Sequence, residues 1–129
     1  METEKISLSD GEWKLMNLLW KKSPRTIAQL VSALKDDTAW TKGTIFMMLS
    51  RMADKGAVRF ETGGRCKLYY PVWKKEIAAT AETESFLSKV YGGSLGLMVA
   101  SMAGQNALTR EDIDELYAIL NKAEKEENA

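Results

Sequence analysis

The alternation of apolar and polar residues in the first 72 residues predicts three helices followed by a two-stranded hairpin. Apolar residues recur at helical spacing over residues 9–22, 26–34 and 42–55. Thr41 is expected to cap the third helix with its hydroxyl, and Gly56 is expected to end it. Helix, helix, turn, helix and hairpin is the element order of a winged helix-turn-helix domain.

The hairpin is predicted from residues that alternate with a period of two. Val58 and Phe60 alternate with charged residues, and Leu68 and Tyr70 alternate with the more polar set of Arg65, Lys67 and Tyr69. Gly63-Gly64 is expected to form a tight turn in which both glycines adopt positive φ.

The third helix is predicted to have two distinct faces. Ile45, Leu49 and Met52 fall together on the face expected to be core. The opposite face carries Gly43, Thr44, Phe46, Met47, Ser50, Arg51 and Asp54. Large apolar residues are unusual on a face that meets only water, so Phe46 and Met47 either contact thymine methyl groups in a major groove or cover a neighbouring helix or subunit.

The polar residues of this region predict contacts to DNA. Thr44, Ser50 and Arg51 are expected to reach base edges or phosphates, and Arg65 and Lys67 of the hairpin are expected to reach phosphates. Charged residues on a hairpin also occur as an ordinary solvated surface. The preceding helix, rather than the charges themselves, favours the functional interpretation.

After Pro71 the sequence predicts a second region, residues 73–129, built from three helices. Their apolar residues are too many to be enclosed by so short a segment, which predicts burial against a second copy of the chain. Folding back onto the first domain is the alternative. The residues expected at the dimer interface are Ile77, Phe86, Leu87, Val90, Leu95, Met98, Val99, Met102, Ile113, Leu116, Tyr117 and Leu120.

Charge is distributed unevenly along a chain whose formal net charge is zero. Residues 1–80 contain 14 Lys and Arg against 9 Asp and Glu, whereas residues 81–129 contain 4 against 9. A basic first domain joined to an acidic tail is the distribution expected of a DNA-binding head with a separate, non-binding region.

The composition argues against an enzyme, a metal site and a cofactor. The chain has no histidine, the commonest general base, and its one cysteine, Cys66, cannot form an internal disulfide. Cys66 is expected to be a packing residue rather than a thiol sensor. Neither a secretion leader nor a membrane-spanning run is recognisable, so a cytoplasmic location is expected.

Five segments in order resemble the penicillinase-repressor (BlaI/MecI) family of bacterial transcriptional repressors, which also includes copper-responsive members. They are WTKGTI at residues 40–45, LSRM at 49–52, KGAV at 55–58, GRCKLYYP at 64–71 and FLSKVYGGSL at 86–95. The resemblance covers residues 8–120. It implies a homodimer on a palindromic operator, with the C-terminal helices forming the dimer and with Thr41, Lys42, Thr44, Arg51 and Arg65 at or near DNA.

The chain departs from this family in three places. Antibiotic-responsive relatives are cut at an Asn-Phe bond, and the matching pair here is Ser101-Met102, so induction by that cut is in doubt. The C-terminal cysteine cluster of copper-responsive relatives is absent. Phe46 and Met47 stand where relatives often have polar groups, which predicts a different operator sequence.

The sequence therefore predicts a mainly α-helical protein with a small β-wing, made of a winged-helix DNA-binding domain at residues 1–72 and a helical dimerisation domain at residues 73–129. The predicted function is a homodimeric repressor that binds double-stranded operator DNA. The alternative is a winged-helix module that binds another protein, with Phe46 and Met47 as its hot spots. The sequence identifies neither the operator nor the inducing signal.

Overall fold

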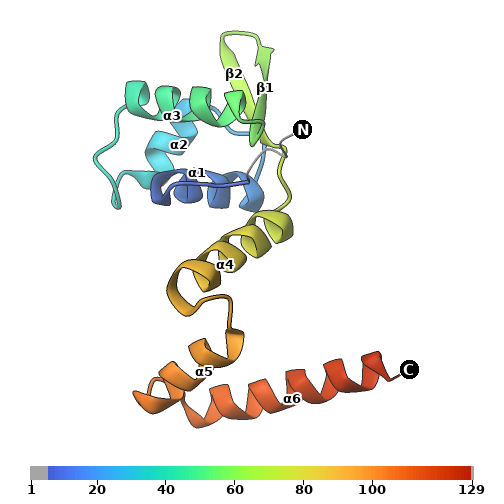
Figure 1. Cartoon of the computed structure of the whole chain (residues 1–129). Coiled ribbons are helices and arrows are strands. Elements are labelled where there is room, and N and C mark those ends of the chain that lie inside the picture. Colours follow the sequence, from blue (N-terminus) through green and yellow to red (C-terminus); the bar gives the residue numbers. More distant parts are fainter. Residues whose placement is uncertain (1–5, 129) are drawn as a thin grey trace. The chain divides into compact units, whose positions relative to one another are not determined.

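The computed structural model describes residues 6–128, which form two compact units divided between Thr83 and Glu84. The fold is mostly helical with one antiparallel hairpin, as the sequence predicted (Figure 1). Its elements are α1 (Asp10–Lys21), α2 (Ile27–Leu34), α3 (Lys42–Asp54), β1 (Val58–Gly63), β2 (Cys66–Pro71), α4 (Lys75–Tyr91), α5 (Leu95–Gly104) and α6 (Arg110–Glu127). The division between the units falls within α4.

Local capping chemistry determines where the first three helices begin. Ser9 and Thr26 are the N-caps of α1 and α2, and each forms a reciprocal capping box with the residue three positions later. Thr41 caps α3 by accepting a hydrogen bond from the backbone N–H of Thr44 at 3.2 Å. The three predicted helices and the cap at Thr41 are confirmed.

Gly56 ends α3 in the way that the sequence predicted. Its φ is +87°, in the left-handed region that glycine adopts without a Cβ clash. The N–H of Gly56 bonds the Ala53 carbonyl at 3.0 Å, and the N–H of Ala57 bonds the Met52 carbonyl at 2.8 Å. This pair of hydrogen bonds is a Schellman motif, and it turns the chain directly into β1.

The core of the first unit lies between α1, α2, α3 and the hairpin. The side chains of Ile45, Leu49 and Met52 are fully buried there, so the predicted inner face of α3 is confirmed. The largest fully buried residues are Tyr69, Leu15, Met16, Leu19, Leu30, Ile45, Leu49 and Met52. Burial of one face on this scale fixes the rotation of α3 about its own axis, and therefore fixes which residues face outward.

The pairing of the hairpin differs from the prediction. Gly63 pairs with Cys66, so the two-residue turn is Gly64-Arg65 and only Gly64 has a positive φ, at +66°. Phe60 pairs with Tyr69, and Tyr69 is the buried residue of β2, whereas Leu68 and Tyr70 lie on the other face. The inward positions of β2 were therefore predicted one residue out of register.

Two further contacts hold the hairpin and the following segment to the rest of the unit. Arg25, in the connection between α1 and α2, exchanges two backbone hydrogen bonds with Tyr69, at 3.2 and 2.9 Å. The indole N–H of Trp20 donates to the carbonyl of Trp73 at 2.9 Å. The base of the wing is thus attached to the helical layer through its backbone.

The second unit contains the end of α4 together with α5 and α6 (Figure 1). Ser94 and Thr109 cap α5 and α6. Within the part of the chain that the structure describes, neither α5 nor α6 has a buried residue. Among residues 6–128, no helix is long and apolar enough to cross a membrane.

Candidate nucleic-acid interface

The outward face of α3 presents the residues that the sequence predicted for it. Thr44, Phe46, Met47 and Arg51 are exposed, and Ser50 is half-buried. The exposed fraction is 44% for Phe46 and 64% for Met47, which is high for apolar side chains of this size. The buried opposite face prevents α3 from rotating these side chains inward.

The beginning of α3 combines capping with exposed polar groups. The hydroxyls of Thr41 and Thr44 lie 3.2 Å apart, close enough to share a hydrogen bond. Lys42, the first residue of the helix, is exposed beside them. The unpaired N–H groups and positive dipole end of the helix add to the charge of Lys42, so this end attracts anions.

An ion pair anchors the other end of α3 to the beginning of α1. The Nζ of Lys55 donates to Oε1 of Glu12 at 2.8 Å and to the carbonyl of Ser7 at 2.9 Å. Burial by itself raises the pKa of the Glu12 carboxyl, but the hydrogen bonds from Lys55 and Ser9 and the charge of Lys55 outweigh burial and leave the pKa below its ordinary value. Glu12 therefore stays ionised and holds Lys55.

The basic side chains on the two faces of the wing have different partners. On the face shared with Leu68, Arg59 pairs with Glu61 at 2.9 Å and stacks on the ring of Tyr70 at 4.0 Å. On the opposite face, the Nζ of Lys67 lies 4.3 Å from the ring centre of Phe60. Arg59 is thus neutralised by a carboxylate, whereas the cation–π contact leaves the charge of Lys67 in place.

The structure brings four of the predicted DNA-binding residues around one cavity. This cavity, of about 290 Å³, lies where the first turn of α2, the exposed face of α3 and the wing meet. Its lining residues are Thr26, Ile27, Ala28, Lys42, Phe46, Arg65, Cys66 and Lys67. Lys42, Phe46, Arg65 and Lys67 are therefore neighbours, while the other predicted residues, Thr41, Thr44, Met47, Ser50 and Arg51, lie along α3 outside this lining.

Comparison with known proteins places the chain. Residues 8–122 match the penicillinase repressor family. The chain belongs to this family. It is 33% identical over 115 residues to the penicillinase repressor of Bacillus licheniformis, covering 89% of this chain and 90% of that protein. It is 25% identical over 122 residues to the methicillin resistance regulatory protein MecI of Staphylococcus aureus, covering 95% of this chain and 99% of that protein.

A solved structure supports the same placement. The solution structure of the DNA-binding domain of the repressor BlaI matches with a TM-score of 0.50 and 29% identity, covering 58% of this chain and 90% of that domain. Membership of the penicillinase repressor family makes this chain a DNA-binding transcriptional repressor and not an enzyme.

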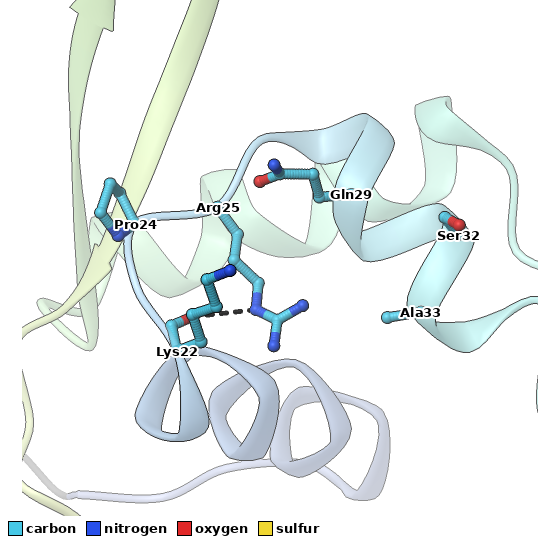
Figure 2. Close-up of a pocket in the computed structure, with 6 residues that line it drawn as sticks. All are labelled: Lys22, Pro24, Arg25, Gln29, Ser32 and Ala33. Carbon is cyan, nitrogen blue, oxygen red and sulfur yellow. Dashed lines mark hydrogen bonds between the residues drawn. The ribbon is translucent and has the colours of Figure 1, made fainter.

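Two basic residues that the sequence analysis did not single out, Lys22 and Arg25, line another cavity. Lys22, Pro24, Arg25, Gln29, Ser32 and Ala33 line a second cavity of about 290 Å³ (Figure 2). The Nε of Arg25 donates to the carbonyl of Lys22 at 2.9 Å, which restrains a guanidinium that lines this cavity. A pair of cations just before the cap of α2 was the signal available in the sequence.

The structure also corrects the interpretation of Cys66. Its thiol is exposed and lines the cavity beside the wing, so it is not a packing residue of the core. Within residues 6–128, no group of three or more His, Cys, Asp or Glu is placed to hold a metal ion.

Proposed function

We propose that this repressor works as a cytoplasmic homodimer on a palindromic operator. Each copy would place α3 in the major groove and its wing on the phosphate backbone, and the bound dimer would block transcription by occlusion. The observation that most directly supports the contact with DNA is the convergence of α3 and the wing cations around one cavity.

The proposed reading of bases rests on the outward face of α3. Its mixture of hydroxyl, guanidinium and apolar side chains suits the major groove, where thymine presents a methyl group and guanine presents two acceptors. Arg51, Ser50 and Thr44 are the polar readers in this proposal, and Met47 is the apolar one. Met47 is more exposed than Phe46, the other apolar residue of this face.

The proposed phosphate contacts come from the beginning of α3 and from the wing beside it. Lys42 and Thr41 lie at the positive end of α3, and Arg65 and Lys67 lie at the turn and on β2. Contacts of this kind fix the orientation of the protein on the duplex and make its affinity fall steeply with salt.

The proposed dimer rests on apolar side chains that one chain leaves exposed. Phe86, Val90, Leu95, Tyr117 and Leu120 are each more than two-fifths exposed. Phe86 and Val90 are four residues apart on α4, Tyr117 and Leu120 are three apart on α6, and Leu95 begins α5. Exposed apolar side chains in this number are characteristic of subunit interfaces, and a symmetric pair of copies would present two heads to the two halves of a palindrome.

The test is a binding footprint of the purified protein across fragmented genomic DNA, followed by titration of the best fragment at several salt concentrations. We expect footprints centred on an inverted repeat and an affinity that falls steeply with salt. A protein-binding module would show a weak salt dependence and no shared sequence among the recovered fragments. That result would overturn the proposal in favour of a protein partner held by Phe46 and Met47.

A further inference from the structure

We propose that Phe46 is a positioning residue for the wing rather than a reader of bases, and that it acts by holding the ammonium group of Lys67. This inference rests on the proposed binding of α3 and the wing to DNA. It changes the role predicted for Phe46 and separates it from Met47, its neighbour on the same helix.

The pairing of the hairpin places Lys67 on the face that turns toward the helices. Phe60 pairs directly with Tyr69, and their rings lie 5.8 Å apart. Lys67 is two residues from Tyr69 along β2, so it shares that face. Because Tyr69 is buried in the core, the same face brings Lys67 over the exposed surface of α3.

The ammonium group of Lys67 lies near two aromatic rings from different elements. Its Nζ is 4.3 Å from the ring centre of Phe60 on β1 and 5.5 Å from the ring centre of Phe46 on α3. Both distances fall within the range in which the negative face of an aromatic ring attracts a cation. Lys67 therefore connects the wing to α3 through its side chain.

This contact leaves Lys67 available to a phosphate. In the wing, Arg59 forms an ion pair with Glu61. Lys67 forms no ion pair with any residue that the structure describes. A lysine side chain is flexible, and two rings that hold its end reduce the freedom it would lose on binding a phosphate. The rings of Phe60 and Phe46 thus restrain the position of the Lys67 ammonium group without neutralising its charge.

Phe46 and Met47 differ in their contact with Lys67. Phe46 is the less exposed of the two, and it lines the cavity together with Lys67 and Arg65. Met47 does not line that cavity and is turned about 100° around the helix axis from Phe46. Met47 is consequently a matched control, being adjacent, apolar and exposed but outside the contact with Lys67.

The first experiment is a double-mutant cycle measured on a duplex selected from a random pool by the wild-type protein. Phe46→Leu should weaken binding about two- to fivefold, the range expected for loss of one exposed cation–π contact. It should leave the salt slope unchanged, whereas Lys67→Met should lower that slope by about one counterion. In the Lys67→Met background, Phe46→Leu should cause no further loss, and Lys67→Arg should keep the sensitivity to Phe46→Leu.

Met47→Ala provides the comparison. Its effect should persist unchanged in the Lys67→Met background, and a repeated selection with this variant should yield an altered sequence, whereas selection with Phe46→Leu should yield the wild-type sequence. A Phe46→Leu loss of equal size with and without Lys67, or a sequence altered by Phe46→Leu, would show that Phe46 reads bases and would overturn the inference. Circular dichroism of each variant confirms that it is folded.

The second experiment tests the contact in the free protein by nuclear magnetic resonance. Ring currents should move the ε-methylene protons of Lys67 upfield of those of the other lysines, and Phe60→Leu should remove more of this shift than Phe46→Leu because its ring is nearer. Ordinary lysine shifts for Lys67 would overturn the inference. Failure of the wild-type protein to bind any duplex would instead overturn the proposed function, and the two results are distinguishable.

Discussion

At the scale of single residues, Gly56 shows how a backbone conformation sets the path from α3 to the wing. An added Cβ would meet no atom within 4 Å, but the φ of +87° is strained for any other residue. We expect Gly56→Ala to lower the free energy of unfolding by about 1 kcal/mol. Gly43→Ala, near the beginning of α3, is the control. Its Cβ would meet only Thr41 Oγ1 at 3.7 Å, so helix propensity should raise stability by up to about 1 kcal/mol. Urea unfolding of both variants measures the two signs, and equal effects would contradict the argument.

Glu12 gives a residue-scale prediction about pH. Its pKa in the folded chain lies below the ordinary 4.5, so its ionised form stabilises the fold above pH 4.5, and this contribution is lost as the pH falls through the folded-state pKa. Glu12→Gln removes a charge-assisted hydrogen bond to Lys55 and should cost about 1–3 kcal/mol at pH 7. The difference from wild type should shrink below pH 4.5. Urea unfolding at pH 7 and pH 3 measures it, and a pH-independent difference would exclude the ion pair as its cause.

At the scale of elements, the helices were more predictable from sequence than the hairpin. Ser9, Thr26 and Thr41 set helix starts through bonds to residues three positions away, so a single sequence contains the whole signal. In the segment from Leu68 to Tyr70, three consecutive apolar or aromatic residues give no clear alternation. The inward face there depends on where the turn falls, and a shift of one residue exchanges the faces.

The candidate site was predicted in part for the same reason. The outward face of α3 followed from its helical period, and of its predicted contact residues only Ser50 is half-buried rather than exposed. The contact of Lys67 with Phe60 and Phe46 depends on the pairing of β1 with β2 and on the packing of the hairpin against α3. Neither relation is contained in a local pattern of residues.

The division of labour between α3 and the wing leads to a prediction at the element scale. Arg51 lies on the groove-facing surface in the proposed complex, so Arg51→Ala should weaken binding to the selected duplex more than binding to bulk DNA. Arg65 lies in the turn of the wing, so Arg65→Ala should weaken both and lower the salt slope by about one. Titrations on both kinds of DNA at several salt concentrations measure this. Equal losses on every DNA for both variants would contradict separate roles.

At the scale of the whole molecule, the sequence of one chain predicts its helices but does not identify the molecule that buries their exposed apolar residues. The apolar periodicity of residues 73–129 predicted three helices, and α4, α5 and α6 are present. Their exposed apolar residues mark a surface that needs a partner, but no pattern within a single chain states which molecule provides it. The dimer interface stays a prediction for that reason. The predicted domain boundary between residues 72 and 73 also stays a prediction.

The dimer can be tested with one apolar position on α6 and one control. Leu120 is 62% exposed in the single chain, and the proposed interface would bury it. Leu120→Glu would then bury an unpaired carboxylate in each copy, at a total cost of about 3 kcal/mol or more for the dimer, which raises the dimer dissociation constant by roughly a hundredfold or more. Sedimentation equilibrium should show monomers at concentrations where the wild type is dimeric.

Lys122→Glu controls for the added negative charge, because residue 122 is turned about 160° around the helix axis from Leu120 and should leave the dimer intact. The two variants should also differ in their affinity for DNA. A Leu120→Glu monomer keeps its α3 and wing, so it should bind an isolated half-site as the wild type does and lose the extra affinity for the full palindrome, since that affinity requires two linked heads. Equal weakening on half-site and palindrome would place Leu120 outside the dimer interface and assign its effect to the folding of the head.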